Sequence, residues 1–407
     1  MAKTVVILGA LDTKGQEFAF LKQLIEAQGL ATLTVDFGVM GVPAFEAQVK
    51  REEVAEAGGE SLDALNSGQQ KDKAMQTMAH GAAVVVRRLF DEGKLDGIIG
   101  MGGSGGTSIA TTAMRTLPVG VPKVMLSTVA GGDVSAYVGT KDIVFIPSIV
   151  DVAGINRISR AMYTLAAGAI TGMVKIEQPP AGEEKPLVAA SMFGNTTTAV
   201  DNARGIMEGK GYEVLVFHAT GTGGKTMESL IADGYISASL DITTTELADY
   251  VCDGVFNAGA ERCLAASRAG IPAVLVPGCV DMANFNSVAS MPEKYQSRNL
   301  YQWNPNVTLL RTNVEENTKI GEMIAAAANA ATAPVEILLP LKGVSMLDSE
   351  GNQFWDPEAD KACYDAIKRN LRPGINVQEL DYNINDPEFS SAVANTLLKL
   401  LGIAVSN

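Results

Sequence analysis

One pattern constrains the fold of this chain more than any other, because a strand–turn–helix–strand sequence occurs twice. The first copy spans 4–37, with a helix expected at about 14–28, and the second copy spans 187–217. Consecutive strands joined by a helix lie parallel in one sheet. The pattern therefore predicts an α/β protein built from two doubly wound, Rossmann-like parallel-sheet domains. The strands are expected at 4–8, 31–37, 187–192 and 212–217.

Two further similarities extend the repeat. Leu95–Met101 resembles Cys252–Ala258, and a helix is expected after each segment. A Gly-X-Pro sequence then begins the next strand, at Gly120–Pro122 in the first copy and at Gly270–Pro272 in the second. Chance similarity between βα units is the alternative explanation, because buried parallel strands resemble one another.

A short linker separates the two copies. Residues 178–186 are rich in Pro, Gly and charge, which is typical of a connection between domains. They predict an N-terminal domain at 1–178 and a C-terminal domain at 186–407. Because ligands of such sheets bind beyond the carboxyl ends of the strands, a cleft flanked by the two domains is the expected site.

The composition excludes several classes of protein. Of the 407 residues, 47% are hydrophobic, which excludes a disordered chain. The formal charge of −14 makes non-specific binding to nucleic acid unfavourable, although it is compatible with a local site for a small phosphate ligand. The most apolar segment, 161–174, is too short to cross a bilayer. With four cysteines and no CxxC pair, the chain is expected to be soluble and cytoplasmic.

The sharpest functional signal is the glycine-rich segment Met101–Ser108, which follows an apolar strand and precedes a helix. Four glycines allow a tight turn in which several N–H groups point at one anion, and the helix N-terminus adds partial positive charge. A strand–helix turn without a ligand is the alternative, but such a turn needs fewer glycines. The segment predicts a phosphate site formed by Gly102, Gly103, Ser104, Gly105, Gly106 and Thr107.

Residues that follow neighbouring strands are expected at the same edge of the first sheet. Asp12, Thr13 and Lys14 follow the first strand, where they either meet a ligand or cap and solvate the next helix. Asp36 ends the second strand, where dinucleotide-binding folds hold a ribose hydroxyl. A later strand, which closes in a hydroxyl- and glycine-rich turn, places Thr128, Gly131 and Asp133 at this edge.

A second glycine-rich turn, at 217–226, also joins a strand to a helix. It fits a relaxed phosphate-loop pattern with Ala219 at the first glycine position, so that Lys225 would reach a phosphate and Thr226 a magnesium ion. Any glycine-rich turn before Lys-Thr gives the same match, so a less specific anion or substrate site is the simpler prediction. Its residues are His218, Gly221, Thr222, Gly223, Gly224 and Lys225.

Three carboxylates of the second half are candidate catalytic residues. Asp241 and Glu246 flank a run of hydroxyl residues and are suited to act as acid, base or magnesium ligand, with a capping box as an equal alternative. Asp281 follows another strand and is expected to face the cleft. A Cys279–His218 nucleophilic pair is a less favoured alternative. The two histidines of the chain argue against a histidine-rich zinc site, and no metal ligands are assigned.

Together these motifs resemble the family of the N-terminal ATP-binding domain of the tomato mosaic virus resistance protein, with its bacterial and fungal homologues, over nearly the whole chain. The resemblance implies two α/β domains flanking a cleft, ATP with Mg²⁺ in the first domain, and a homodimer. The matching segments are Leu11–Gly15, Gly102–Thr107, Gly131–Ser135, Asp151–Ser159, His218–Gly224, Leu240–Ala248, Asn304–Pro305, Leu309–Thr312 and Ile384–Pro387.

The chain departs from the family pattern at three places. Trp303 and Asn383 stand where the family usually has histidine. If those histidines act on a substrate, this chain has a changed specificity or has lost an activity. Lys225–Thr226 is not the usual continuation after the glycines, which weakens the phosphate-loop interpretation.

The leading functional prediction is an ATP-binding enzyme that acts on a small metabolite. Phosphoryl or adenylyl transfer is the natural chemistry, because it needs mainly anion-holding groups and Mg²⁺. The first alternative is a regulatory or protein-binding module that responds to ATP without hydrolysing it. The second alternative is an enzyme that acts on a sugar acid or acyl phosphate without any nucleotide.

Overall fold

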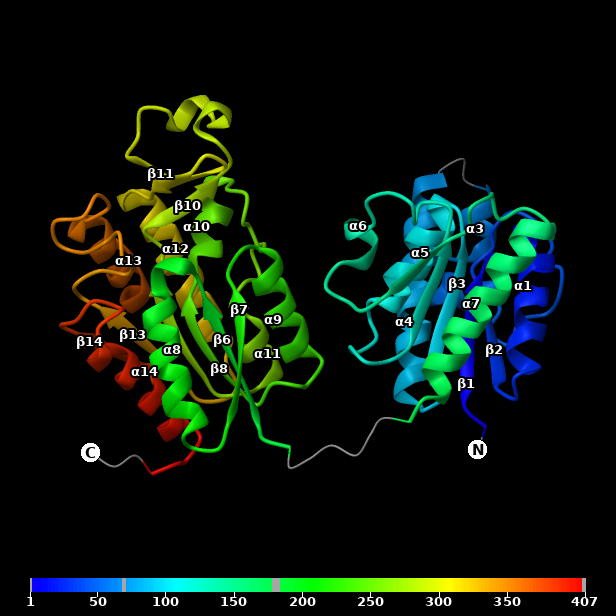
Figure 1. Cartoon of the computed structure of the whole chain (residues 1–407), viewed down its shortest axis with the longest axis horizontal. Helices are drawn as coiled ribbons and strands as arrows, with labels where there is room; N and C mark the ends of the chain where they lie inside the picture. The colour runs from blue at the N-terminus through cyan, green and yellow to red at the C-terminus, as the bar shows by residue number, and fades with distance from the viewer. Residues whose placement is uncertain (1, 68–70, 178–183, 405–407) are drawn as a thin grey trace. The chain divides into compact units, whose positions relative to one another are not determined.

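The computed structural model describes residues 2–67, 71–177 and 184–404, which Figure 1 shows as ribbons. The chain divides into two compact units, Met1–Ala181 and Gly182–Asn407, and each is described by itself. Most of the linker predicted at 178–186 lies outside the described residues, as does the predicted domain end at residue 178. Both units have the α/β architecture that the sequence predicts.

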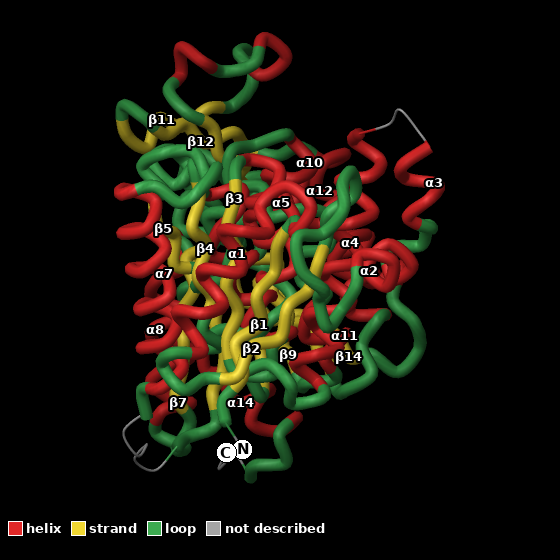
Figure 2. The backbone as a smooth tube through the Cα atoms, turned by 90° about the vertical axis from the view of Figure 1, so that its right-hand side faces the viewer, coloured by secondary structure: helices red, strands yellow, loops and turns green. Residues whose placement is uncertain are grey.

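The first unit is built on a five-stranded parallel sheet with the order β2-β1-β3-β4-β5 (Figure 2). Its strands are β1 (Thr4–Gly9), β2 (Ala31–Asp36), β3 (Gly97–Gly102), β4 (Lys123–Ser127) and β5 (Val144–Pro147). Val5 of β1 pairs with Thr32 on one side and with Gly97 on the other. The chain therefore winds in one direction from β1 to β2 and in the other from β3 to β5. Sheets of this order bind ligands where the direction reverses, at the carboxyl ends of β1 and β3.

Helices cover both faces of this sheet. They are α1 (Leu11–Glu26), α2 (Arg51–Ala57), α3 (Leu62–Ser67), α4 (Lys71–Asp91), α5 (Ser104–Met114), α6 (Ser135–Val138) and α7 (Arg157–Lys175). Val5 and Ile7 pack against α1 and α7, whereas Val6 and Leu8 pack against α2, α4 and α5. Successive side chains of a strand point to opposite faces, so both faces are apolar here. This explains why these strands are almost continuously apolar in sequence.

The second unit repeats this winding in a six-stranded parallel sheet with the order β14-β13-β9-β8-β6-β7. Taken in chain order, its first five strands have the same arrangement as β1 to β5, and β14 extends the sheet. The repeat inferred from the sequence is thus visible as a common strand order. The strands are β6 (Leu187–Met192), β7 (Glu213–His218), β8 (Ala238–Thr243), β9 (Ala273–Gly278), β13 (Val335–Pro340) and β14 (Asn376–Leu380).

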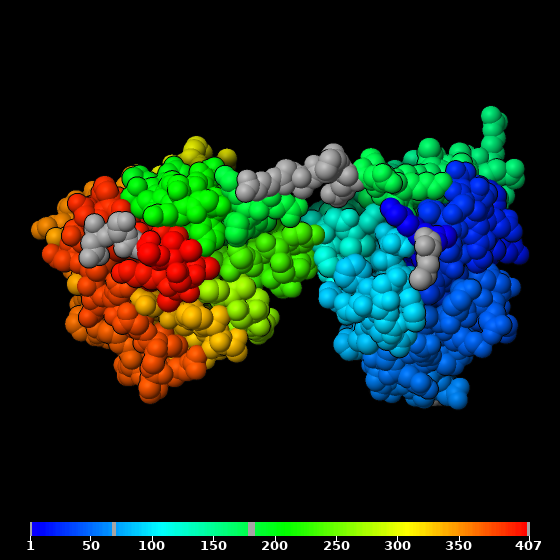
Figure 3. All heavy atoms as spheres, turned by 90° about the horizontal axis from the view of Figure 1, so that it is seen from below, coloured from blue at the N-terminus to red at the C-terminus, as the bar shows by residue number. Residues whose placement is uncertain are grey.

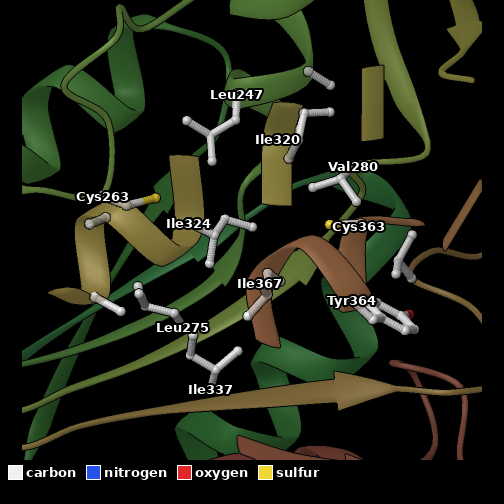
Figure 4. Close-up of a cluster of buried hydrophobic side chains, with 14 of the residues drawn as sticks. Leu247, Cys263, Leu275, Val280, Ile320, Ile324, Ile337, Cys363, Tyr364 and Ile367 are labelled. Atoms are coloured by element: carbon white, nitrogen blue, oxygen red, sulfur yellow. The ribbon is translucent and has the colours of Figure 1, made fainter. Parts of the chain in front are cut away.

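The helices of the second unit are α8 (Thr197–Glu208), α9 (Thr222–Ala232), α10 (Thr245–Cys252), α11 (Ala265–Ala269), α12 (Val314–Asn329), α13 (Pro357–Asn370) and α14 (Pro387–Leu400). One face of the sheet packs against α10, α12 and α13, where Leu275 and Ile337 meet Ile324 and Ile367 (Figure 4). The other face packs against α8 and α14. These two helices lie side by side on the surface, in green and red in Figure 3.

A small antiparallel sheet, which was not expected from the sequence, is inserted between β9 and β13. It contains β10 (Met282–Phe285), β11 (Leu300–Asn304) and β12 (Val307–Arg311) in the order β10-β12-β11. Short 3₁₀ turns at Gly194–Thr196, Val288–Ser290 and Glu293–Tyr295 complete the unit. The insertion places Trp303 close to Gly194, which follows β6, and pairs Arg311 with Met282, which follows β9, so both lie near the carboxyl edge of the parallel sheet.

One part of the predicted repeat is wrong. Cys252–Ala258 forms no strand, because Cys252 ends α10 and Asp253 adopts a left-handed conformation with φ +58° that terminates the helix. The true counterpart of β3 is β8. The Gly-X-Pro segments do precede equivalent strands, β4 and β9. Two predicted helix starts are also wrong, since α1 begins at Leu11 and not at about residue 14, and α5 begins at Ser104 and not at Thr107.

None of the helices in the described ranges combines the length and apolarity that a membrane span requires. Within the same residues, no group of three or more His, Cys, Asp and Glu side chains is arranged to hold a metal ion.

Candidate functional site

A pocket of about 670 Å³ lies at the carboxyl edge of the first sheet, where the winding reverses. The turns after β1, β2 and β3 form one side of it, and α3 and α4 contribute the other. Its volume lies within the range of about 300–1,000 Å³ that is usual for small-molecule sites. The pocket is therefore placed and sized as the fold predicts for a ligand site.

The glycine-rich turn presents the N-terminus of α5 to this pocket. Gly103 is the N-cap, and the first hydrogen bond of the helix joins the N–H of Thr107 to the carbonyl of Gly103 at 2.9 Å. The N–H groups of the three preceding residues consequently have no acceptor within the helix. Gly105 and Gly106 line the pocket, and each carries one of these N–H groups. Such a helix end attracts anions.

The other predicted residues of this turn have different positions. Gly102 lines the pocket, and a side chain there would approach Cα of Gly106 to 3.3 Å, so the close turn favours glycine. Thr107 is buried, and its hydroxyl contacts the Gly103 carbonyl at 2.8 Å and the Ser127 hydroxyl at 2.6 Å. Thr107 therefore supports the turn from behind. Ser104 is exposed, and neither it nor Gly103 is part of the pocket wall.

Two carboxylates shape the loop that follows β2. Asp36 is buried, and its Oδ1 accepts hydrogen bonds from the N–H groups of Leu11 at 3.0 Å and Gly38 at 2.8 Å. Burial raises the pKa of Asp36, and these two donors offset the effect only in part. Asp36 thus joins the turns after β1 and β2, and it does not line the pocket in the way predicted for a ribose-binding residue.

Asp12 completes this arrangement from the pocket wall. Its Oδ2 accepts from the N–H groups of Met40 at 2.8 Å and Gly41 at 3.0 Å. A Cβ atom at Gly38 would lie 2.5 Å from Oδ1 of Asp12, so the loop can pass the carboxylate only as glycine. Asp12 therefore holds the loop 38–41 in place, and Thr13 lies exposed beside it on the pocket wall.

Lys14 occupies a distorted position near the start of α1. Its backbone leaves the helical region, with φ −132° and ψ 24°, and the side chain contributes to the pocket wall. The ammonium group donates a hydrogen bond to the carbonyl of Val152, in the segment between β5 and α7. The predicted cation is thus present at the pocket, with a main-chain acceptor already in contact.

The remaining candidates of the first unit do not belong to the pocket wall. Thr128, Gly131 and Asp133 are all exposed on the turn after β4. The N–H of Ser135 donates to Asp133 Oδ1 at 2.9 Å, and hydrogen bonds from Ser135 lower the pKa of this carboxyl. Asp133 therefore stabilises the start of the short helix α6.

The apolar wall of the pocket is the part that sequence reasoning missed. Methionine side chains are frequent in it, and Met75 lies so close to the glycine turn that a Cβ at Gly105 would be 3.2 Å from its methyl group. Methionine at helical spacing is read first as ordinary core, so the sequence offered no separate signal. Lys71 and Asn66 are polar residues of this wall. The apolar members include Phe37, Met40, Leu65, Met75, Met78, Met101 and Ile109.

In the second glycine-rich turn, a side chain of the protein itself binds the main-chain N–H groups. Gly221 has φ +80° and caps α9, as a turn of this kind requires. The carboxylate of Glu246 accepts from the N–H groups of Gly221 at 2.6 Å and Gly224 at 3.1 Å. A Cβ at Gly224 would lie 2.1 Å from Glu246 Oε2. In this conformation a carboxylate of the chain itself occupies the position predicted for an external anion.

Glu246 belongs to a buried ionic cluster around Arg262. The guanidinium contacts Glu246 Oε2 at 2.6 Å, Asp241 at 2.5 and 2.7 Å, and Glu228 at 3.1 Å. Arg262, Asp241 and Glu246 are all almost fully buried. Burial also raises the pKa of Glu228, while Arg262 lowers it. The geometry gives Asp241 and Glu246 a structural role and does not favour the catalytic role predicted for them.

The exposed residues of this turn remain accessible to solvent. His218, Thr222 and Lys225 are exposed, and the ring of His218 meets that of Phe193 edge-on with centroids 5.5 Å apart. Gly223 must be glycine, because a Cβ there would lie 1.8 Å from the carbonyl oxygen of His218.

Asp281 lies in a second buried cluster. Its Oδ2 accepts from the Ser345 hydroxyl at 2.8 Å, and burial together with Asp348 raises its pKa to about 7. Arg311 contacts Asp348 at 3.4 Å and Asp360 at 2.7 Å, and burial raises the pKa of Asp360 to about 9. Asp281 is fully buried, so it does not present its carboxyl at a surface as predicted.

Cys279, the candidate nucleophile, and the two positions where the family usually has histidine lie in different surroundings. Cys279 is fully buried and burial raises its pKa well above the usual range, which does not favour a nucleophilic role. Asn383 donates to the carbonyls of Lys342 at 3.0 Å, Ser345 at 3.3 Å and Asp348 at 3.3 Å, so it fixes the loop after β13. Trp303 is exposed on β11.

Comparison with known proteins finds family matches over almost the whole chain. The model of the N-terminal domain of the uncharacterised protein family UPF0261 matches residues 3–179, and that of its C-terminal domain matches residues 185–401. A UPF0261 protein of Clostridium tetani is 48% identical over 402 residues, which covers 98% of this chain and 100% of that protein. A UPF0261 protein of Mesorhizobium japonicum is 42% identical over 394 residues, covering 96% of this chain and 98% of that protein.

A plant protein is also similar. The ToMV resistance protein Tm-1(GCR237) of Solanum lycopersicum is 37% identical over 419 residues, which covers 97% of this chain and 55% of the tomato protein. The family resemblance inferred from the motifs is therefore confirmed. With both domain models matched and relatives aligned over almost the full length, this chain belongs to the uncharacterised protein family UPF0261.

Proposed function

We propose that the first unit binds ATP, with the phosphates at the N-terminus of α5 and the purine against the methionine-rich wall. The observation that carries the proposal is the helix end: Gly105 and Gly106, whose N–H groups have no acceptor within the helix, line a pocket at the reversal point of the sheet. Gly105 and Gly106 would donate these N–H groups to phosphate oxygens. Lys14 and Lys71 would add positive charge at the wall.

The apolar wall supports a ligand with a flat ring. Methionine side chains adapt to irregular surfaces, and their sulfur atoms make favourable contacts with aromatic rings. Met75, Met78 and Met101 line the pocket close to the glycine turn. A sugar acid or a simple acyl phosphate would leave this surface unused, so the wall favours a nucleotide over the metabolite-only alternative.

Magnesium fits this pocket less well than the nucleotide does. Among the described residues of the pocket wall, Asp12 is the only one with a carboxylate. Its Oδ2 already accepts hydrogen bonds from two N–H groups. Its Oδ1 is buried against Gly38. Oδ1 accepts no hydrogen bond, but it is shielded from solvent, so this conformation offers a metal ion no accessible carboxylate oxygen and no step is assigned to protein-bound Mg²⁺.

The geometry favours binding over group transfer. Asp241 and Glu246, which were predicted as catalytic, are buried and paired with Arg262. Asp281 is buried as well. ATP would then act by stabilising one conformation of the protein, which is the first alternative raised by the sequence.

Calorimetry with ATP, ADP, adenosine and phosphorylated metabolites tests the proposal. Gly105→Asp should weaken ATP binding at least about 100-fold, because it places a negative charge at the anion site and blocks the backbone. The fold should tolerate the change, since the nearest neighbour is the flexible end of Met75 and acidic residues suit the first turn of a helix.

Ser108→Asp is the matched control, because Ser108 is an exposed residue of the same helix outside the pocket wall. It adds the same charge and should bind ATP nearly as well as the parent. ATP binding by Gly105→Asp at the parental affinity would show that the site is elsewhere. Steady ATP turnover by the parent would instead restore the transferase hypothesis.

A further inference from the structure

Lys14 connects the pocket to a surface segment of the first unit. Its side chain lines the pocket, and its ammonium group donates to the carbonyl of Val152. Val152 lies between β5 and α7, in a segment that does not itself line the pocket. One side chain therefore contacts both the ligand space and the segment 149–155.

The same segment is held at a second point, farther along the chain. The N–H of Gly154 donates to the Glu17 carboxylate, and the Gly154 carbonyl accepts from Ser159 at 3.0 Å and Tyr163 at 3.4 Å. Glu17 stands one helical turn after Lys14 on α1, so the two residues hold neighbouring parts of the segment. At its other end, the Ser148 N–H donates to the Ser127 carbonyl at 3.1 Å and the Ser148 hydroxyl donates to the Val150 carbonyl at 2.6 Å, and the Val152 side chain packs in the core. Loss of the Lys14 bond would release the main chain at Val152 from α1 while Gly154 stays attached.

The part before Gly154 carries backbone strain. Ile149 has φ +65°, a left-handed conformation that β-branched residues rarely adopt, and its side chain is 68% exposed. Strain of this kind persists only while neighbouring contacts hold the backbone in place. The Lys14–Val152 bond is such a contact, which makes the segment sensitive to any competitor for the ammonium group.

We propose that an anion bound at the N-terminus of α5 takes the Lys14 ammonium from the Val152 carbonyl and thereby loosens residues 149–153. This inference rests on the proposed function, because the anion is the phosphate group of the bound nucleotide. A hydrogen bond from an ammonium to a charged oxygen is about twice as strong as one to a neutral acceptor. The flexible stem of lysine allows the group to move between the two acceptors.

The transfer of the Lys14 ammonium from Val152 to the ligand depends on the charge of the ligand rather than on filling of the pocket. Adenosine would occupy the apolar wall but offer no anion to Lys14, so the bond to Val152 would persist. ATP would loosen the segment and change the surface around the exposed side chain of Ile149. The pocket would in this way convert the presence of phosphate into an altered surface of the first unit.

Hydrogen exchange of the full-length protein, followed by mass spectrometry on peptides covering 148–156, tests this inference. With saturating ATP the hydrogen-bonded amide of Val150, which donates to the Ser148 carbonyl at 2.7 Å, should exchange about tenfold faster, because loss of a nearby hydrogen bond to a charged group makes local opening easier. Adenosine should leave the rate unchanged. These two measurements need no variant, so they are independent of any effect of mutation on folding.

In the Lys14→Met variant the amides of this segment should exchange fast without any ligand. ATP should then not increase their exchange rate further. Lys71→Met is the control, because it removes another pocket lysine that makes no contact with Val152 in the described structure. This variant should keep the slow rate of the parent in the absence of ligand. Peptides covering β3 provide an internal reference for global unfolding.

The two proposals fail in different ways. If calorimetry shows no ATP binding to the parent, the proposed function is wrong and the phosphate trigger is wrong with it. If ATP binds but the exchange of 148–156 is unchanged, the ammonium keeps both acceptors and this inference alone is overturned. A slow parental rate in Lys14→Met without ligand would also overturn it.

Discussion

The two sheets of this chain share a strand order but use their carboxyl edges in opposite ways. In the first, the N-terminus of α5 opens onto a pocket of about 670 Å³. In the second, the N-terminus of α9 is covered by Glu246, which Arg262 pairs in turn. A glycine-rich turn before a helix thus indicates that an anion can be bound there. Whether the anion comes from outside or from the chain depends on residues far away in sequence.

The two carboxyl edges also differ in how they are stabilised. At the first edge, Asp12 and Asp36 accept hydrogen bonds from main-chain N–H groups, and Thr107 bonds through its hydroxyl, so the described partners of these side chains are neutral. The second edge buries charged clusters around Arg262 and Arg311. Buried charges are costly to separate, so the second unit should be much more sensitive than the first to loss of a single charged partner.

The largest expected effect follows from breaking the Arg262 cluster. Arg262→Met leaves Asp241, Glu246 and Glu228 without their cation and should lower the free energy of unfolding of the second unit by about 3–5 kcal/mol. Both tryptophans, Trp303 and Trp355, lie in this unit, so fluorescence during urea unfolding follows it selectively.

Arg268→Met is the matched control for that experiment, because Arg268 pairs with Glu261 at the surface, where both side chains are exposed. It should leave the urea midpoint nearly unchanged. Equal stability of the Arg262 and Arg268 variants would show that the cluster contributes nothing, and the comparison between the two edges would lose its energetic basis.

The next effect is a pH dependence of the stability of the second unit. Burial and neighbouring carboxylates raise the pKa of Asp281 to about 7 and that of Asp360 to about 9, from 3.8. The folded state retains protons that the unfolded chain releases above pH 4. Stability of the second unit should therefore fall as the pH rises from about 4, until the pKa of each carboxyl in the folded state is passed.

Asp281→Asn removes one of these protons and should flatten the dependence between pH 5 and 7. Urea unfolding followed by tryptophan fluorescence at pH 5, 7 and 9 measures the effect. The same slope in parent and variant would mean that Asp281 is ionised in the folded protein throughout this range.

The smallest expected effect concerns the open edge. Thr107→Val keeps the shape of the side chain but removes the bonds to Gly103 and Ser127, which should cost about 1 kcal/mol in the first unit. Thermal unfolding followed by circular dichroism reports this change, and the ATP affinity should fall less than in Gly105→Asp.

Thr112→Val is the control for this variant, since Thr112 makes a hydroxyl bond of the same kind to Ser108 farther along α5. A loss of stability for Thr107→Val no larger than for the control would indicate that the buried hydroxyl does not support the turn.

Much of the architecture followed from local sequence. The apolar strand runs, the connecting helices and the Gly-X-Pro strand starts predict two parallel sheets, because parallel strands buried on both faces have few polar residues. Cys252–Ala258 misled the prediction, since Asp-Gly begins a strand in one unit and ends a helix in the other. The antiparallel insertion of β10 to β12 is also not marked by a repeat.

The site was only partly predictable for a physical reason. Gly102, Gly105 and Gly106 could be found because the turn requires them locally. The methionine wall and the Glu246 carboxylate come from segments that approach only after folding. Asp36 and Asp12 were expected to meet a ligand, but their oxygens bind N–H groups of the adjacent loop.

Gly224 lies so close to Glu246 that a larger residue cannot replace the glycine while the carboxylate stays in place. A relative with a larger residue at the first position has to move or replace the carboxylate at the second, so the two should vary as a pair during evolution. In such a relative the end of α9 would be vacant, and the pair of residues would mark which members of the family have gained a second opening for small molecules.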